Sequence, residues 1–134
     1  MTAQLDLRSL NADAAWTMGK AMTSIMATHT AYKVAMIEGN EVGLSFTDYR
    51  DHCLCTVTES PEGGARITFP KGARIKEHDQ DPNGVLAGEG DVRWLDVPPC
   101  ELVKESEIVR LMQSAAALNE MGRQTAMWRE SHRL

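Results

Sequence analysis

The sequence predicts an α+β domain in which two terminal helices pack on one face of an antiparallel sheet of about five strands. Residues from about 13 to 26 and from about 103 to 121 carry apolar side chains at spacings of three and four, which indicates amphipathic helices. Between them, short runs of alternating apolar and polar residues are separated by glycine and proline, as in strands joined by short turns. Elements with one apolar face each bury those faces by stacking in two layers.

Length and composition indicate one domain. The chain has 134 residues, 43% of them hydrophobic, and a formal net charge of −5, which favours a single core and argues against nucleic acid as a partner. No apolar run approaches the ~20 residues of a membrane helix, and the N-terminus lacks a signal-peptide pattern. The three cysteines are an odd number, which fits a reducing compartment. We therefore expect a cytoplasmic protein without a membrane partner, either a monomer or a homodimer.

The first half of the chain predicts a helix and then a meander of strands. The core-facing stripe of the helix is predicted to comprise Ala15, Met18, Met22, Ile25 and Met26. Alternating residues at 32–36 and 42–46 predict two strands, and Gly39-Asn40 between them suits a tight hairpin turn. The pattern then predicts a third strand at 52–58 and a fourth at 65–69, which Pro70 ends because proline has no amide donor.

In the third strand, strict alternation places Cys53 and Cys55 on the same face as Val57. Residues two apart on a strand are awkwardly placed for a disulfide. We therefore expect two thiols that face the core rather than a redox or metal pair.

The stretch from Ile67 to Val97 organises the second half of the chain. After a charged loop, Asp81-Pro82 predicts an N-cap and a first helical residue, and Gly88 and Gly90 would end a helix of one or two turns. A fifth strand follows at 92–97. Its apolar residues fall on both faces of the strand, so a bulge or burial of both faces is predicted.

The C-terminal helix has a clear apolar stripe. Its members are Ile108, Leu111, Met112, Ala115 and Leu118. Gly122 is a natural end for this helix, so the domain is expected to span 1–122 and to be followed by a basic tail, 123–134. The sequence leaves open whether this tail forms a further helical turn.

Three segments carry a resemblance to a known family: 69–73 (FPKGA), 81–90 (DPNGVLAGEG) and 115–119 (AAALN). Together they resemble the YdhG-like family of small bacterial domains. The resemblance implies a frataxin-like arrangement of two terminal helices on an antiparallel sheet. Most members have no established activity, and some relatives have been proposed as iron chaperones. The chain departs from the family at Glu89 and Asp91, where a small hydroxyl residue and a basic residue are common.

Two groups of residues are candidate sites. Backbone amides near Gly72, Gly88 and Gly90 could form an anion-binding concavity with charge from Lys71 or Arg93. Trp94 and Trp128 could line a ligand pocket, although a tryptophan on a sheet is more often part of the core or of an interface. Plain turn geometry is the alternative for these glycines. The candidate metal ligands are Glu77, His78, Asp79 and Asp81. Oxygen and imidazole ligands suit iron, manganese or zinc, although a run of this kind is more often a solvated loop.

No catalytic residue is predicted. The four histidines accompany no nucleophile elbow and no metalloprotease helix, and no pair of carboxylates can be given acid and base roles. The leading hypothesis is a non-catalytic module that binds a small ligand or a protein between the sheet and the loop from Lys71 to Gly90. The alternative is an iron or other metal chaperone that uses the acidic loop, and an enzyme with an unrecognised site is a third hypothesis.

Overall fold

A computed structural model of the chain describes residues 12–28, 31, 33–37, 40–61, 63–77, 84–99 and 105–131. The elements, in chain order, are α1 (Ala12–Ala27), β1 (Lys33–Ile37), β2 (Asn40–Thr47), β3 (Cys53–Glu59), β4 (Ala65–Phe69), α2 (Gly72–Glu77), β5 (Arg93–Val97) and α3 (Glu105–Ser131).

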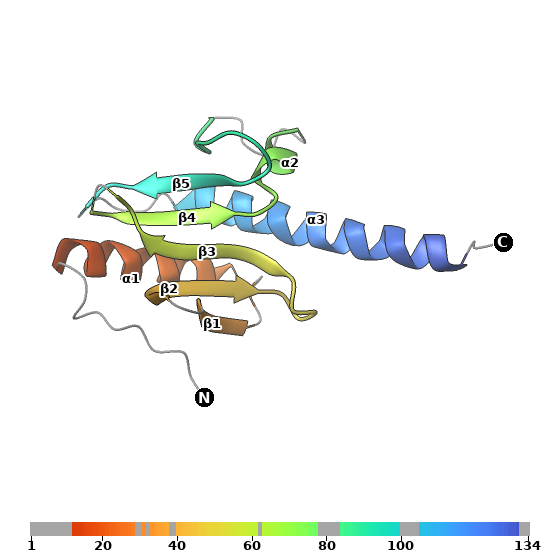
Figure 1. The fold of residues 1–134 in the computed structure, drawn as a ribbon, viewed down its shortest axis with the longest axis horizontal. Helices are drawn as coiled ribbons and strands as arrows, with labels where there is room; N and C mark the ends of the chain where they lie inside the picture. The colour runs from red at the N-terminus through yellow and green to blue at the C-terminus, as the bar shows by residue number, and fades with distance from the viewer. Residues whose placement is uncertain are drawn as a thin grey trace.

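The five strands form one sheet in the order of the sequence, β1-β2-β3-β4-β5, and each neighbouring pair is antiparallel. Helices α1 and α3 lie side by side on the same face of this sheet, and the short helix α2 lies beside α3 and β5 (Figure 1). The opposite face carries no helix among the described residues. The predicted two-layer α+β fold is thus confirmed.

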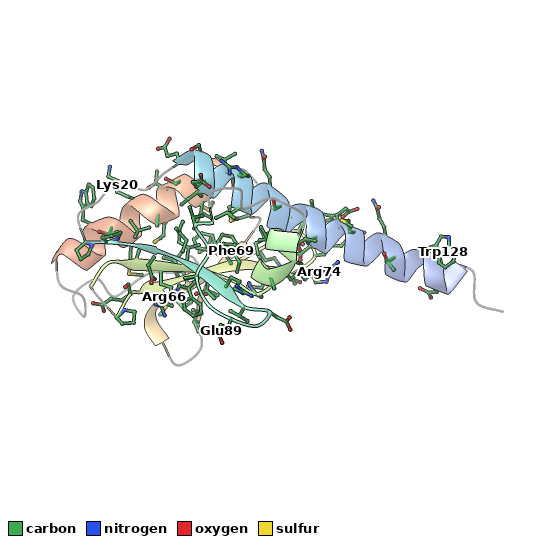
Figure 2. All side chains as sticks on the ribbon, turned by 90° about the horizontal axis from the view of Figure 1, so that it is seen from above. Lys20, Arg66, Phe69, Arg74, Glu89 and Trp128 are labelled. Atoms are coloured by element: carbon green, nitrogen blue, oxygen red, sulfur yellow. The ribbon has the colours of Figure 1, made fainter. Side chains whose placement is uncertain are left out.

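The core lies between the sheet and the two long helices. Ile67 and Phe69 of β4 are buried, as their alternation with polar residues predicts, and Phe69 projects from the sheet toward α3 (Figure 2). The predicted α3 stripe is also buried in full, with Ile108 and Leu111 at most 1% exposed. Full burial of side chains of this size stabilises a fold by about 1.5–3 kcal/mol each. The layering is therefore fixed by one apolar face on each element.

The predicted alternation in β3 is wrong at its first residues. The β2–β3 register shifts between Phe46 and Thr47, so Leu54 lies at a bulge and is buried. Cys53 is displaced to the open face, where its Sγ lies 3.7 Å from Ser45 Oγ. Cys55 faces the core, with its Sγ 3.6 Å from Met112 Sδ on α3. An extra residue in one strand changes which face each later side chain occupies, and period counting does not anticipate it.

The predicted short helix near Gly88 is also wrong over the residues that are described. Residues 84–90 are not helical; instead, the backbone of Ala87 pairs with Trp94 through N···O distances of 2.7 and 3.1 Å. The helix of this region lies earlier, at α2, in the stretch predicted as a charged loop. It begins where the carbonyl of Lys71 accepts from the amides of Arg74 and Ile75, and Ile75 is fully buried. One buried side chain thus fixes a helix too short to show a period.

Two predicted details of the long helices are also wrong. Helix α3 continues through Gly122 to Ser131, because glycine permits a helix to end without requiring it and the residues around it favour helix. On α1, Met26 is 46% exposed although it was assigned to the buried stripe. Met18, Ala21 and Ile25 face the core, so the stripe follows a slightly different line along the helix.

Candidate functional site

A buried polar junction ties the β2–β3 turn to the middle of α3 and to the start of α2. The side chain of Asn119, 3% exposed, accepts a hydrogen bond at Oδ1 from Lys71 Nζ, at 2.7 Å. Its Nδ2 donates to Asp48 Oδ2 at 3.1 Å and to the carbonyl of Cys53 at 3.4 Å. Lys71, a predicted ligand-binding residue, thus contacts a buried amide on α3. The arrangement joins three separate parts of the chain, and we therefore interpret it as a structural junction.

Asp48 is the charged end of this junction. Its Oδ1 accepts from the backbone amides of Arg50 and His52 at 2.8 and 3.0 Å, which shapes the turn and accommodates the positive φ of 65° at Asp51. Burial raises the pKa of the Asp48 carboxyl, but those two amides, Asn119 and the charge of His52 outweigh it. The net pKa is lowered, so Asp48 is a carboxylate at neutral pH and not a poised acid.

The predicted glycine site is occupied by the protein itself. A Cβ on Gly72 would lie 2.3 Å from Cβ of Arg93, and one on Gly88 would lie 2.6 Å from the ring of Trp94. The carbonyl of Gly90 accepts from Nε of Arg93 at 2.8 Å. Near the start of α2, the amide of Ala73 donates to the carbonyl of Asp91 at 3.0 Å. Gly72 and Gly88 thus lie where the chain passes close to residues of β5, whereas a Cβ on Gly90 would meet nothing within 4 Å.

Trp94 lies on the open face of the sheet, away from Lys71. The guanidinium of Arg66 stacks over its ring at 4.7 Å and forms a two-pronged ion pair with Asp96 at 2.8 and 3.0 Å. Figure 2 shows Arg66 on the side of the sheet opposite the helices. The ring is therefore covered by Arg66 and by Gly88, and the five predicted ligand-binding residues do not converge on one pocket.

The predicted metal ligands His78, Asp79 and Asp81 lie outside the described residues, and of Glu77 the structure describes only the backbone, at the end of α2. Within 12–28, 31, 33–37, 40–61, 63–77, 84–99 and 105–131, no three His, Cys, Asp or Glu side chains are grouped closely enough to hold a metal ion.

A cavity lies between α2 and α3. Its volume is about 340 Å³ and it is open to solvent on one side. It is lined by Ile75, Arg110, Gln113, Ser114, Ala117, Leu118 and Met121. Ligand sites of small molecules begin at about this size and combine apolar walls with a few polar groups. This is the candidate functional site.

Among the residues that the structure describes, Arg110 is the one charged residue that lines this cavity. Its Nη2 donates to Glu107 Oε1 at 3.3 Å, one turn earlier on α3, and the Glu107 side chain is 7% exposed. Its Nη1 is buried and has no hydrogen-bond acceptor among the described residues. A buried donor without an acceptor costs about 1–3 kcal/mol. The Arg110 side chain as a whole is 30% exposed, so part of it is accessible to a ligand in the cavity.

Sequence reasoning did not find this cavity. Ile75 lies in a segment interpreted as a loop, and Arg110 and Gln113 are not members of the apolar stripe that the sequence predicts for the C-terminal helix. One signal was available: Glu107 and Arg110 lie three residues apart and beside the apolar stripe, which allows an ion pair at its edge. The cavity itself depends on where α2 rests, which no local pattern in the sequence specifies.

Comparison of the chain with protein-family models, with curated proteins and with solved structures finds no match. In the part of the chain that the structure describes, no helix is both long and apolar enough to cross a membrane.

Proposed function

We propose that this chain is a non-catalytic binding module that holds a small organic anion in the cavity between α2 and α3. The single observation that carries the proposal is Arg110, a charged side chain that is 30% exposed and lines that cavity. Membership in the YdhG-like family and a cytoplasmic location belong to the same proposal and depend on the sequence motifs and composition.

The walls of the cavity specify the kind of ligand. Ile75, Leu118 and Met121 offer apolar surface, while Gln113 and Ser114 add neutral polar groups. A carboxylate with a short hydrocarbon tail matches this division, because the guanidinium fork is suited to carboxylate oxygens and the tail would leave water. Glu107 already forms an ion pair with Arg110, which weakens the attraction of Arg110 for a ligand anion. We therefore expect modest affinity for a small acid, with a Kd on the order of millimolar.

The experiment is calorimetry with two ligands of equal length, hexanoate and hexanol. Wild-type protein should bind hexanoate more tightly than hexanol, because only the carboxylate forms a charge-assisted hydrogen bond with the Arg110 guanidinium. Arg110→Met should weaken hexanoate roughly tenfold or more, since hydrogen bonds to charged groups contribute about 1.5–3 kcal/mol. Its affinity for hexanol should change little, and Arg110→Lys should restore part of the difference.

Arg50→Met is the matched control, because Arg50 is exposed on the β2–β3 turn, away from the cavity. It should leave both affinities unchanged. Equal affinities of wild-type protein for hexanoate and hexanol, or no effect of Arg110→Met on hexanoate, would rule out the proposed function.

A further inference from the structure

The cavity between α2 and α3 changes in polarity along α3. The lining residues that α3 contributes lie on one face of the helix and are, in chain order, Arg110, Gln113, Ser114, Ala117, Leu118 and Met121. In that order the side chains are first charged, then neutral and polar, then apolar. From the first to the last the helix rises by about 16 Å, at 1.5 Å per residue. A linear ligand with its carboxylate at Arg110 would therefore direct its hydrocarbon tail toward Met121.

Ser114 lies between the charged end and the apolar end of this cavity. Its side chain lines the cavity, and the residue is only 8% exposed. Within the described part of the chain, no group forms a hydrogen bond with the Ser114 hydroxyl. The oxygen is nevertheless accessible, because the side-chain atoms that are fully sealed from solvent without a partner belong to other described residues. A hydroxyl is both a donor and an acceptor, so Ser114 offers the cavity a polar group that the protein does not use.

The position of Ser114 relative to Arg110 indicates where a ligand would need its second polar group. The two residues are four apart on α3, and Cβ atoms at this spacing lie about 5–6 Å from each other. The guanidinium of Arg110 turns away from Ser114, because its Nη2 donates to Glu107, three residues earlier on the helix. A carboxylate bound to this guanidinium would lie on the far side of Arg110 from Ser114. A ligand oxygen that bonds to Ser114 would thus be on the carbon chain, beyond the carboxylate.

We propose that this cavity selects short-chain 3-hydroxy acids, with the carboxylate on Arg110 and the hydroxyl on Ser114. The tail then lies against the apolar walls from Ile75, Leu118 and Met121. The inference rests on the proposed function, which supplies the carboxylate contact, and it narrows the class of ligand. Carbon 3 suits the spacing better than carbon 2, whose hydroxyl lies directly beside the carboxylate. Three separate contacts also distinguish the two enantiomers, so the site should prefer one of them.

The test is calorimetry of the full chain with hexanoate and with each enantiomer of 3-hydroxyhexanoate. The preferred enantiomer should bind wild-type protein about threefold to tenfold more tightly than hexanoate, which is the range that one hydrogen bond contributes. In Ser114→Ala this gain should vanish, while the affinity for hexanoate stays the same. A purely structural role of Ser114 would instead weaken the binding of both ligands together.

Ser24→Ala is the matched control. Ser24 is also a helical serine that is 8% exposed, but it lies on α1 and does not line the cavity. Alanine favours helix, so both variants should keep the fold, and Ser24→Ala should keep the full gain from the ligand hydroxyl. The isomer 2-hydroxyhexanoate is the control on the ligand side, and its gain over hexanoate should be smaller.

The outcomes distinguish failure of this inference from failure of the proposed function. If hexanoate binds and depends on Arg110, but neither enantiomer binds more tightly than hexanoate, the proposed function holds and the 3-hydroxy acid is overturned. A gain that persists in Ser114→Ala, or that is equally large for 2-hydroxyhexanoate, also overturns it. If neither hexanoate nor 3-hydroxyhexanoate binds, both proposals are overturned.

Discussion

The two halves of α3 have the same helical geometry but different surroundings. From Ile108 to Leu118 the helix buries an apolar stripe against α1 and the sheet, whereas Met121 and Trp128 further along the helix are exposed. The difference arises because the sheet lies under only the first half (Figure 1). One continuous helix thus contributes to the core over its first half and carries exposed large side chains, Met121 and Trp128, over its second half. The cavity lies where the two halves meet.

The largest expected effect is a core truncation in the first half. Leu111 is fully buried, so Leu111→Ala should lower the free energy of unfolding by about 2–5 kcal/mol through lost burial and the cavity left behind. Trp128→Ala in the second half should stay within about 0.5 kcal/mol. Urea unfolding at micromolar protein concentration measures both. Similar losses for the two variants would break the distinction between the halves.

The next effect concerns Asn119, at the boundary of the halves. Asn119→Ala removes the partner of Lys71 Nζ and of Asp48 Oδ2, and groups left without partners cost about 1–3 kcal/mol. Gln124→Ala, five residues further along, loses only an exposed 3.4 Å contact with Glu120 and should change little. Chemical denaturation compares the two variants. A loss for Asn119→Ala no greater than for Gln124→Ala would show that the junction is not structural.

The same junction predicts a pH dependence. Because the pKa of Asp48 is lowered in the folded state, the unfolded chain binds its proton first as the pH falls. The stabilisation is thus complete above the unfolded pKa and is lost as the pH drops through the folded pKa. Asp48→Asn should flatten the stability curve between about pH 5 and pH 2. An unchanged acid slope of the free energy of unfolding in that variant would contradict the assignment.

The smallest expected effect is a gain at Gly122. A Cβ there meets nothing within 4 Å, and alanine is favoured over glycine inside a helix by about 0.5–1 kcal/mol. Gly122→Ala should therefore raise the thermal midpoint slightly. Gly88→Ala should lower it, because Gly88 has a φ of +105° and its added Cβ would meet the Trp94 ring at 2.6 Å. A loss with Gly122→Ala would mean that the second half of α3 is not helical in solution.

The sequence was sufficient to predict the layers but not the site. Apolar stripes at helical and strand spacing predicted α1, α3 and the buried face of β4, because each of those elements has one apolar face and a regular spacing of apolar residues. The alternation of apolar and polar residues did not reveal the bulge at Leu54, because one extra residue leaves the overall composition of the strand unchanged. The bulge moves Cys53 to the open face of the sheet.

The cavity was beyond sequence reasoning for a related reason. Helix α2 has six residues, fewer than two turns, so no period can identify it. Its placement through Ile75 against α3 creates the cavity and brings Arg110 to its wall. By contrast, Lys71, Gly72 and Gly88 stood out in the sequence because of the family resemblance, and the structure uses all three in close packing or in the junction with Asn119.

The cavity at the meeting point of the two halves is proposed to bind a small organic anion. Methyl NMR of Ile75, Leu118 and Met121 during titration with hexanoate tests this proposal, with Val34 on β1, the edge strand opposite β5, as the reference methyl group. We predict saturable shifts at the three cavity methyl groups, much smaller shifts with hexanol, and none at Val34. Unchanged cavity methyl groups at millimolar hexanoate, or equal shifts with hexanol, would contradict it.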